Sequence, residues 1–424
     1  MKLRGNRIII TKVILVSVVS LLISFMFITN SFANGVLLDA KGPITLGRGG
    51  TNIAHSDNGI LIYDNPAALA RLQGKKIEGA LDMLMFPMKY KDSSNNKKGE
   101  DQAFFLPTFA YTHNIQQSRF GMGAGVYNPA GFSAEYNLNH PVYGEQKYFS
   151  NASLTKILLG AGYNITDKWS FGIGFGPSYS NMELEMPYTF QTGPLQGTPS
   201  LIDMEGDDWS LTWNLGTQWQ ASSSTTVGLS YICQDEFRVE GDTDVEVMGL
   251  GTSNYKVGFD FRWPQILGAG VKHLYKTNHS ISLDVLWIDW SSAFNEMKLE
   301  LSEGNGVGWP GSAQDTFPLH WKDSYSLRLG YEYFLNAKDT LRFGYIYNEN
   351  PVPSSTLTPL IPGIIKHEVS LGYGRTWGKW AFNVSYLYAF KSEQSVSNSE
   401  ILGGDFDQST VKISAHFLSL RFQY

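Results

Sequence analysis

The chain has 424 residues, a formal net charge of −6 and 17% charged residues. This negative charge balance argues against a nucleic-acid partner, which would require a basic surface, so we expect none. The single cysteine, Cys233, excludes an internal disulfide. A charged fraction below the ~25% of ordinary globular chains is typical of proteins with many lipid-facing side chains.

Residues 1–33 have the pattern of a secretory signal peptide. Four basic residues precede the apolar run 13–27, and Ser31 and Ala33 are small residues at the two positions that a signal peptidase reads. We expect cleavage after Ala33. The alternative is an uncleaved inner-membrane anchor, because the apolar run is nearly long enough to span a bilayer. No later stretch approaches ~20 unbroken apolar residues, so we expect no transmembrane helix in the mature chain.

Residues 34–74 show little strand alternation. Within them Asn65 can cap a short helix that has Pro66 in its first turn and Ala67 after it. The strands that follow predict a barrel wide enough to hold a lumen, so we expect residues 34–74 to form a hatch inside it.

From residue 75 to residue 424 apolar and polar residues alternate with the period of a β-strand. In the last strand Leu418 and Phe422 share one face with Tyr424, and Ser419 and Arg421 share the other. An even number of such strands, each long enough to cross a bilayer as a tilted strand of ~9–11 residues, predicts an all-β fold, an antiparallel transmembrane barrel. We expect fourteen strands, at 76–90, 103–113, 119–133, 152–165, 169–180, 208–220, 224–240, 256–274, 279–298, 322–335, 340–349, 366–376, 379–390 and 411–424.

The connections between these strands alternate in length. Short periplasmic turns and long extracellular loops are typical of barrels in the outer membrane of Gram-negative bacteria. With six short and seven long connections, both ends of the barrel are expected in the periplasm. The long connections are 91–102, 134–151, 181–207, 241–255, 299–321, 350–365 and 391–410.

Two strands carry glycine at every second position, with apolar residues between. If the apolar residues face lipid, the glycines leave room in the lumen for the hatch or for a ligand. The alternative is relief of crowding in a strongly coiled sheet. The glycines are Gly121, Gly123, Gly125, Gly172, Gly174 and Gly176.

Pro129 lies inside the third expected strand. Proline removes a ladder hydrogen bond, so it belongs at a sheet edge or at a break, and a barrel has no edge. Together with Asn128 and Gly131, Pro129 predicts a local rupture of pairing through which an apolar solute could leave sideways into the outer leaflet. The alternative is a bulge near the rim that has no role in transport.

Apolar residues concentrate in or beside the two long connections 134–151 and 181–207. Exposed apolar and methionine-rich patches usually bind something, so these residues predict a capture groove for a hydrophobic ligand. The alternative is that the loops pack on one another. The candidate ligand-binding residues are Phe132, Tyr136, Tyr143, Met182, Leu184, Met186, Tyr188 and Phe190.

Eleven short motifs occur in one order along the chain: Leu46–Gly50, Tyr63–Leu69, Gly125–Phe132, Ile288–Ser291, Trp321–Asp323, Leu329–Tyr331, Leu341–Gly344, Pro351–Pro353, Thr358–Pro359, Ile361–Pro362 and Ser370–Tyr373. In these motifs and their order the chain resembles the FadL family, the outer-membrane transporters of long-chain fatty acids and of compounds such as aromatic hydrocarbons. The resemblance implies a monomeric barrel of fourteen strands, a hatch marked by Asn65, Pro66 and Ala67, and a lateral wall gap at Asn128, Pro129 and Gly131.

The partners that the resemblance implies are a hydrophobic small molecule, namely a fatty acid or a hydrocarbon, outer-membrane lipids and lipopolysaccharide. The C-terminal strand would meet the barrel-assembly machinery. Lys322 and Arg328 are candidates to meet a carboxylate headgroup. However, Gly363 replaces the acidic residue that is usual in the family, and Lys366 lies where the family usually has arginine.

No nucleophile motif organises the Ser, His and Asp residues, and no histidine has ligand spacing with another His or Cys. We therefore expect no catalytic site, no metal and no cofactor. The favoured function is passive transport of a hydrophobic molecule. The alternative is a structural or surface-interaction barrel. An apolar cavity beneath the loops that abuts Asn65–Ala67 would favour transport.

Overall fold

The computed structural model describes residues 35–114, 118–404 and 406–424. The predicted signal peptide, residues 1–33, lies outside these described residues. Among the described helices, none has the length and apolar character needed to cross a membrane.

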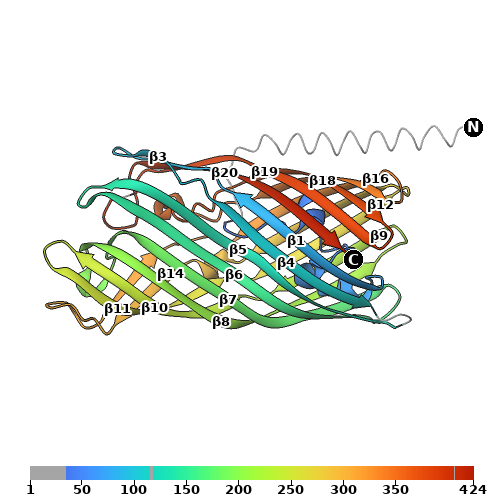
Figure 1. The fold of residues 1–424 in the computed structure, drawn as a ribbon, viewed down its shortest axis with the longest axis horizontal. Helices are drawn as coiled ribbons and strands as arrows, with labels where there is room; N and C mark the ends of the chain where they lie inside the picture. Colours follow the sequence, from blue (N-terminus) through green and yellow to red (C-terminus); the bar gives the residue numbers. More distant parts are fainter. Residues whose placement is uncertain (1–34, 115–117, 405) are drawn as a thin grey trace, which may run out of the picture. The chain divides into compact units, whose positions relative to one another are not determined.

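Most of the described chain is strand (Figure 1). The strands are β1 (Lys75–Met85), β2 (Met88–Lys91), β3 (Asn96–Lys98), β4 (Ala103–Asn114), β5 (Phe120–His140), β6 (Gly144–Asn164), β7 (Trp169–Thr189), β8 (Pro199–Gln220), β9 (Thr225–Ile232), β10 (Asp235–Val247), β11 (Gly251–Trp263), β12 (Ile266–Tyr275), β13 (His279–Ile288), β14 (Glu296–Ser302), β15 (Ala313–Pro318), β16 (Ser324–Phe334), β17 (Asp339–Asn348), β18 (His367–Trp377), β19 (Trp380–Val396) and β20 (Ser409–Gln423). The short helices are α2 (Pro43–Gly47), α3 (Leu61–Asp64), η1 (Pro66–Ala70), η2 (Gly193–Leu195), α4 (Trp290–Ala293) and η3 (Ser354–Thr356).

The sheet closes on itself through its first and last strands. β1 pairs with β4 on one side and with β20 on the other, from Glu78↔Gln423 to Met85↔His416. β1 and β20 lie side by side in Figure 1. The strand segments form a closed antiparallel barrel of fourteen strands, because some of the barrel strands are interrupted and count as two segments. This confirms the predicted all-β barrel of fourteen strands.

The two faces of the wall differ in polarity as the alternation predicts. On β20, Leu418 and Phe422 are 40% and 57% exposed, whereas Ser419 and Arg421 are 0% and 3% exposed. The buried Arg421 pairs with Glu78 of β1 at 2.7 Å. The outward apolar side chains suit lipid, and the inward polar groups find partners inside the barrel.

Aromatic rings gather on the outer face beside the short turns. Trp169 stacks on Trp219 with ring centroids 5.7 Å apart, and Trp380 lies 4.8 Å from Tyr424. All four rings are at least 39% exposed. Such exposed rings near strand ends suit the interfacial girdle of a membrane barrel.

Several predicted long connections are wrong, because the strands continue through them. β5 and β6 have 21 residues each and leave only 141–143 between them, and β7 and β8 leave only 190–198. The pairing extends beyond the ~9–11 residues that a bilayer needs because the alternation that makes a strand does not stop at the membrane surface.

Four predicted strands are broken in two. The strand expected at 256–274 breaks at Pro264, which has no N–H for the ladder, and the one expected at 279–298 contains α4. The side chain of Asp289 caps α4 by accepting a hydrogen bond from Ser292 N at 3.2 Å. The other two breaks, at 86–87 and 233–234, separate β1 from β2 and β9 from β10.

Candidate functional site

An apolar pocket, here called the outer pocket, lies among the extended strands and the connection that carries Leu360. Its volume, including space that is open to solvent, is about 670 Å³. Five of the predicted ligand-binding residues line it: Phe132, Met182, Leu184, Met186 and Tyr188. The hydroxyl of Tyr188 donates to Asp315 at 2.6 Å, so this ring presents its apolar body while its polar end is satisfied.

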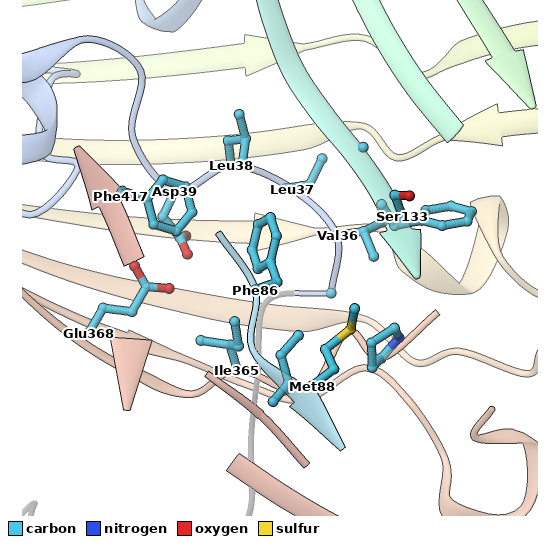
Figure 2. A pocket seen from close by; sticks show the side chains of 15 residues that line it. Val36, Leu37, Leu38, Asp39, Phe86, Met88, Ser133, Ile365, Glu368 and Phe417 are labelled. Atoms are coloured by element: carbon cyan, nitrogen blue, oxygen red, sulfur yellow. The ribbon is translucent and has the colours of Figure 1, made fainter. Parts of the chain in front are cut away.

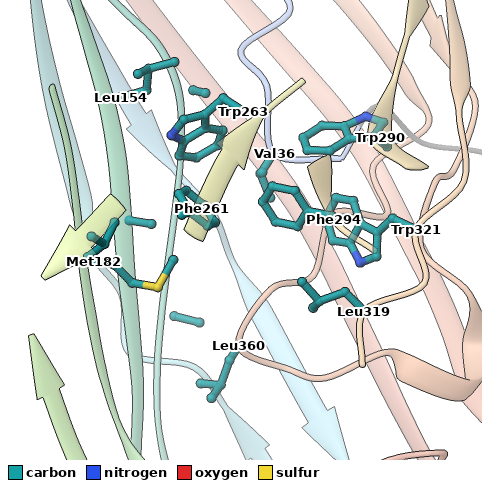
Figure 3. Packing of buried hydrophobic residues seen from close by; sticks show 14 of the residues in the cluster. Val36, Leu154, Met182, Phe261, Trp263, Trp290, Phe294, Leu319, Trp321 and Leu360 are labelled. Atoms are coloured by element: carbon teal, nitrogen blue, oxygen red, sulfur yellow. The ribbon is translucent and has the colours of Figure 1, made fainter. Parts of the chain in front are cut away.

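Phe261 and Phe294, which line the outer pocket, belong to a cluster of aromatic rings (Figure 3). The Phe294 ring lies 4.7 Å from Trp321, 5.0 Å from Trp290 and 5.5 Å from Phe261. Trp290 and Phe294 are 0% and 1% exposed. Because these rings support one another, the pocket has a rigid aromatic side suited to apolar or aromatic ligands.

A second pocket, here called the inner pocket, is lined by residues 35–39 at the beginning of the described chain. Its volume, including space that is open to solvent, is about 610 Å³. In Figure 2, residues 36–38 run along one side of it, and Phe86 and Met88 lie on the other. Phe132 lines both the inner and the outer pocket. The inner pocket abuts residues 35–39, and Asn65, Pro66 and Ala67 line neither of the two pockets.

The wall changes its pairing at the predicted break in β5. The β4–β5 ladder ends at Phe109↔Val126, although β4 pairs with β1 as far as Ala103. The β5–β6 register shifts between Tyr127 and Ala130, so Asn128 and Pro129 lie opposite one residue of β6. The side chain of Asn128 instead donates to Pro107 O at 2.9 Å and accepts from Thr155 Oγ1 at 2.8 Å. These contacts hold the two neighbouring strands to β5 where the regular ladder is interrupted.

The start of the described chain binds the β5 edge at this break. Leu37 forms an antiparallel bridge with Ala130. On either side of it, Leu38 N donates to Pro129 O at 2.9 Å and Gly131 N donates to Val36 O at 3.1 Å. Residues 36–38 therefore satisfy backbone groups of β5 that β4 leaves without a partner.

The remainder of the amino-terminal segment, residues 35–74, is almost wholly buried against the inner face of the wall. Asn65 caps η1 by accepting from Ala67 N at 3.2 Å, and Pro66 is the first residue of η1, which confirms the predicted local structure. The amide of Asn65 also donates to Ile53 O at 2.8 Å and to Thr217 O of β8 at 3.2 Å. Asn65 thus joins two parts of the segment to the wall.

The inward glycines make room for this segment, as one of the two interpretations predicts. A Cβ added at Gly121 would lie 2.0 Å from Leu69 O, and one at Gly172 would lie 2.2 Å from Ala67 N. Gly123 lies similarly against Ile62. Gly125 and Gly176 face other residues, Tyr127 and Ile157. Side chains at Gly121, Gly123 and Gly172 would therefore displace the segment.

Ion pairs join the amino-terminal segment, residues 35–74, to β16. Arg48 Nη1 lies 2.7 Å from Asp57 and 3.6 Å from Glu332, and Arg342 Nε lies 2.9 Å from Glu332. Possible metal ligands of His55, Asp57 and Glu332 lie within 4.8 Å of one another. Because the two arginines already supply positive charge to both carboxylates, we interpret this cluster as an ion-pair network.

Five predicted ligand-binding residues lie outside both pockets. Tyr136 is buried against Tyr90, Tyr143 donates to Pro199 O at 2.9 Å, and Phe190 packs edge-on against Tyr188. Lys322 is exposed. Arg328 is buried and pairs with Asp39 at 3.0 Å.

Sequence reasoning missed several residues that line the pockets. Phe261 and Phe294 line the outer pocket, and Val36, Leu38 and Glu368 line the inner pocket. The aromatic spacing Trp290 to Phe294 is a helical i, i+4 signal, which could have indicated α4. No local pattern marks residues 36–38, because their partners on β5 are far away in the sequence.

Comparison with known proteins gives relatives over most of the chain. A family model described as outer membrane protein transport protein (OMPP1/FadL/TodX) matches residues 25–424. A long-chain fatty acid transport protein of Salmonella typhi is 21% identical over 415 residues, which cover 88% of this chain and 90% of the relative. The protein of the same description in Escherichia coli O6:H1 is 22% identical over 338 residues, 72% of this chain and 70% of the relative.

Solved structures share the fold. A FadL homologue of Pseudomonas aeruginosa superimposes with a TM-score of 0.78 at 15% identity, covering 92% of this chain and 99% of its own. The toluene transporter TodX of Pseudomonas putida gives a TM-score of 0.76 at 18% identity with the same coverage. The family model spans nearly the whole chain and confirms the resemblance, so this protein is an outer-membrane β-barrel that belongs to the OMPP1/FadL/TodX family of transport proteins.

Proposed function

We propose that this protein is a passive outer-membrane channel for apolar small molecules, either long-chain fatty acids or hydrocarbons. The observation that carries the proposal is the position of Phe132. This residue lines both pockets and comes directly after Gly131, close to the break in β5. A ligand that passes Phe132 moves from the outer pocket into the inner pocket without entering water.

The outer pocket supports capture. Its lining is almost entirely apolar, and methionines such as Met182 and Met186 adapt to ligands of different shape. The names of relatives fit this chemistry, since they include a long-chain fatty acid transport protein and a toluene transporter.

Release is proposed to occur sideways, between β4 and β5. Regular pairing of these strands ends at Val126, and residues 36–38 cover the β5 edge beyond it. Detachment of residues 36–38 would expose this edge from the inner pocket, and an apolar ligand would gain free energy by entering lipid directly. In this proposal residues 34–74 act as the hatch and close the lumen to water.

The test is uptake of radiolabelled toluene and of a radiolabelled long-chain fatty acid by cells that lack other such channels. Cells that express this protein should take up at least one of the two faster than cells with an empty vector. Leu360→Asp places a charge in the outer pocket without changing a wall strand, because Leu360 is 3% exposed and lies on a connection. We expect this variant to lose most of the uptake.

The matched control is Leu402→Asp, at an exposed leucine of a different connection. It should transport as the unmodified protein does. A surface-interaction barrel, the alternative function, predicts no protein-dependent uptake of either molecule. Equal uptake by the two aspartate variants would contradict capture in the outer pocket.

A further inference from the structure

The inner pocket is apolar except at three side chains. The described residues that line it carry polar side chains at Asp39, Ser133 and Glu368, and none of them is lysine or arginine. Figure 2 shows Asp39 and Glu368 at the side where Phe417 lies, with Ser133 apart from them across the pocket. A ligand in this pocket therefore meets hydrocarbon along most of its length and a carboxyl pair at one end.

The two carboxyl groups differ in how their hydrogen bonds are satisfied. Asp39 Oδ1 accepts from Arg328 Nη2 at 3.0 Å, and Asp39 Oδ2 accepts from Asn348 Nδ2 at 2.8 Å. Glu368 Oε1 has only a long contact of 3.5 Å with the same Asn348 amide. Glu368 is 4% exposed and its carboxyl group lies beside that of Asp39, but no described residue donates a hydrogen bond to its Oε2.

A buried acceptor without a donor is rare and costs free energy. Because Glu368 belongs to the lining of a cavity, a bound molecule can supply the donor that the protein lacks. The pocket thus has the features of a built site, namely an apolar body and one polar group aimed at the occupant.

Three kinds of polar ligand group can be compared at this position. A carboxylate has only acceptors, so it would face the acceptor Oε2 of Glu368 without a proton to donate. An ammonium carries three donors, of which the lining could satisfy few, and its burial costs desolvation. A hydroxyl needs one acceptor for its single proton, and Glu368 Oε2 is one such acceptor.

We propose that the inner pocket selects apolar molecules that carry a neutral hydroxyl group, such as an alcohol or a phenol, by accepting their O–H at Glu368, and that it disfavours carboxylates. This inference rests on the proposed function and narrows it: of two molecules with the same apolar body, the hydroxylated one is bound in preference to the acid at this point of the route.

The test compares three molecules with one ring: p-xylene, p-cresol and 4-methylbenzoate. Their binding to the purified mature protein is measured by calorimetry. The preference is defined as the dissociation constant of p-xylene divided by that of p-cresol, so that the greater hydrophobicity of p-xylene cancels between variants. Glu368→Met replaces the carboxylate with an apolar side chain of similar length, and it should lower the preference by roughly tenfold or more.

Ser133→Ala is the matched control, because Ser133 is the polar lining residue away from the carboxyl pair and its Oγ contacts Gln102 Oε1 at 3.3 Å. It should leave the preference unchanged. Glu368→Gln is a second variant that keeps the shape of the side chain and replaces its carboxyl group with an amide, which adds N–H donors. It should tighten the binding of 4-methylbenzoate several-fold, relative to p-xylene, so the proposal remains testable if Glu368→Met fails to fold.

An unchanged preference in Glu368→Met would overturn the proposal, as would a loss of preference in Ser133→Ala alone. Unchanged binding of 4-methylbenzoate to Glu368→Gln would also overturn it. Uptake separates this inference from the proposed function. If cells take up p-xylene through the protein but Glu368 does not affect the preference, only the inference fails, whereas absence of uptake of all three molecules contradicts the channel itself.

Discussion

Leu37 and Ala130 form an isolated antiparallel β-bridge between the amino-terminal segment and the edge of β5. The hydrogen bonds that flank it join Leu38 to Pro129 and Gly131 to Val36, so Leu37 and Ala130 are a non-hydrogen-bonded pair. The Cα atoms of such a pair are ~4.5 Å apart, which is within the range that a disulfide bridges. The bridge can therefore be locked chemically.

The first prediction uses this lock. In the double variant Leu37→Cys with Ala130→Cys, oxidation should fix residues 36–38 on β5 and reduce uptake to that of cells without the channel. Reduction with dithiothreitol should restore uptake, because the protein is otherwise unchanged. The native Cys233 is buried and does not need to be removed. Each single cysteine variant serves as a control, and an oxidised double variant that transports normally would exclude release at this edge.

The second prediction concerns the fit between the segment and the wall. Gly172→Val should displace residues 65–70, because even a Cβ at Gly172 would lie 2.2 Å from Ala67 N and from Pro66 C. The barrel should stay closed and heat-modifiable, since the β1–β20 ladder is untouched. Single-channel conductance in planar bilayers should rise because water fills the space that the segment leaves.

Gly79→Val is the matched control for that variant. Gly79 is also a strand glycine, but a Cβ there would have nothing within 4 Å. Its conductance should equal that of the unmodified protein. If Gly172→Val and Gly79→Val conduct equally, the segment does not close the lumen.

Local patterns in the sequence predict the wall and part of the segment. Alternation along 411–424 places Leu418 and Ser419 on opposite faces because a strand fixes the direction of each side chain. The helix start at Asn65 and Pro66 is equally local, since the cap and the capped N–H are two residues apart. In both cases the interaction that decides the structure lies within a few residues.

The pockets could not be predicted in the same way. The outer pocket brings Phe132, Phe261 and Leu360 together from three distant parts of the chain. Whether Glu368 Oε2 receives a hydrogen bond depends on where Asn348 and Asp39 lie, and only the closed barrel determines their positions. The lengths of β5 and β6 were underestimated because the alternation is the same inside and outside the membrane.

The third prediction tests the orientation of the barrel. Val307, in the connection between β14 and β15, is 95% exposed, and Lys338 is exposed in the short turn between β16 and β17. Val307→Cys should react with an impermeant thiol reagent on intact cells. Lys338→Cys should react only after the outer membrane is breached, and its labelling from outside would reverse the assigned topology. The unmodified protein, whose Cys233 is 4% exposed, is the blank.

The fourth prediction is that acid weakens the docking of the amino-terminal segment through His55. This histidine is 0% exposed, and its Nδ1 lies 3.7 Å from Asp57 Oδ2 and 3.9 Å from Glu332 Oε2. Burial, with the Arg48 guanidinium and Lys272 nearby, lowers the pKa of His55 from 6.5 to about 4. The docked segment therefore holds a neutral imidazole, whereas a released segment takes up a proton near pH 6.5.

The sign of the effect follows from proton binding. Between pH 6.5 and about 4 the released form binds more protons, so docking weakens as the pH falls through this window, by up to on the order of 3 kcal/mol, and is unaffected above it. Burial raises the pKa of Asp57, but Arg48 and His55 lower it well below 3.8, so Asp57 contributes only at lower pH. Hydrogen–deuterium exchange of residues 48–58, corrected for intrinsic rates, should be faster at pH 5 than at pH 7.5. His55→Gln should remove this difference, since glutamine does not titrate. Exchange of the unmodified protein that is the same at both pH values would show that His55 does not control docking.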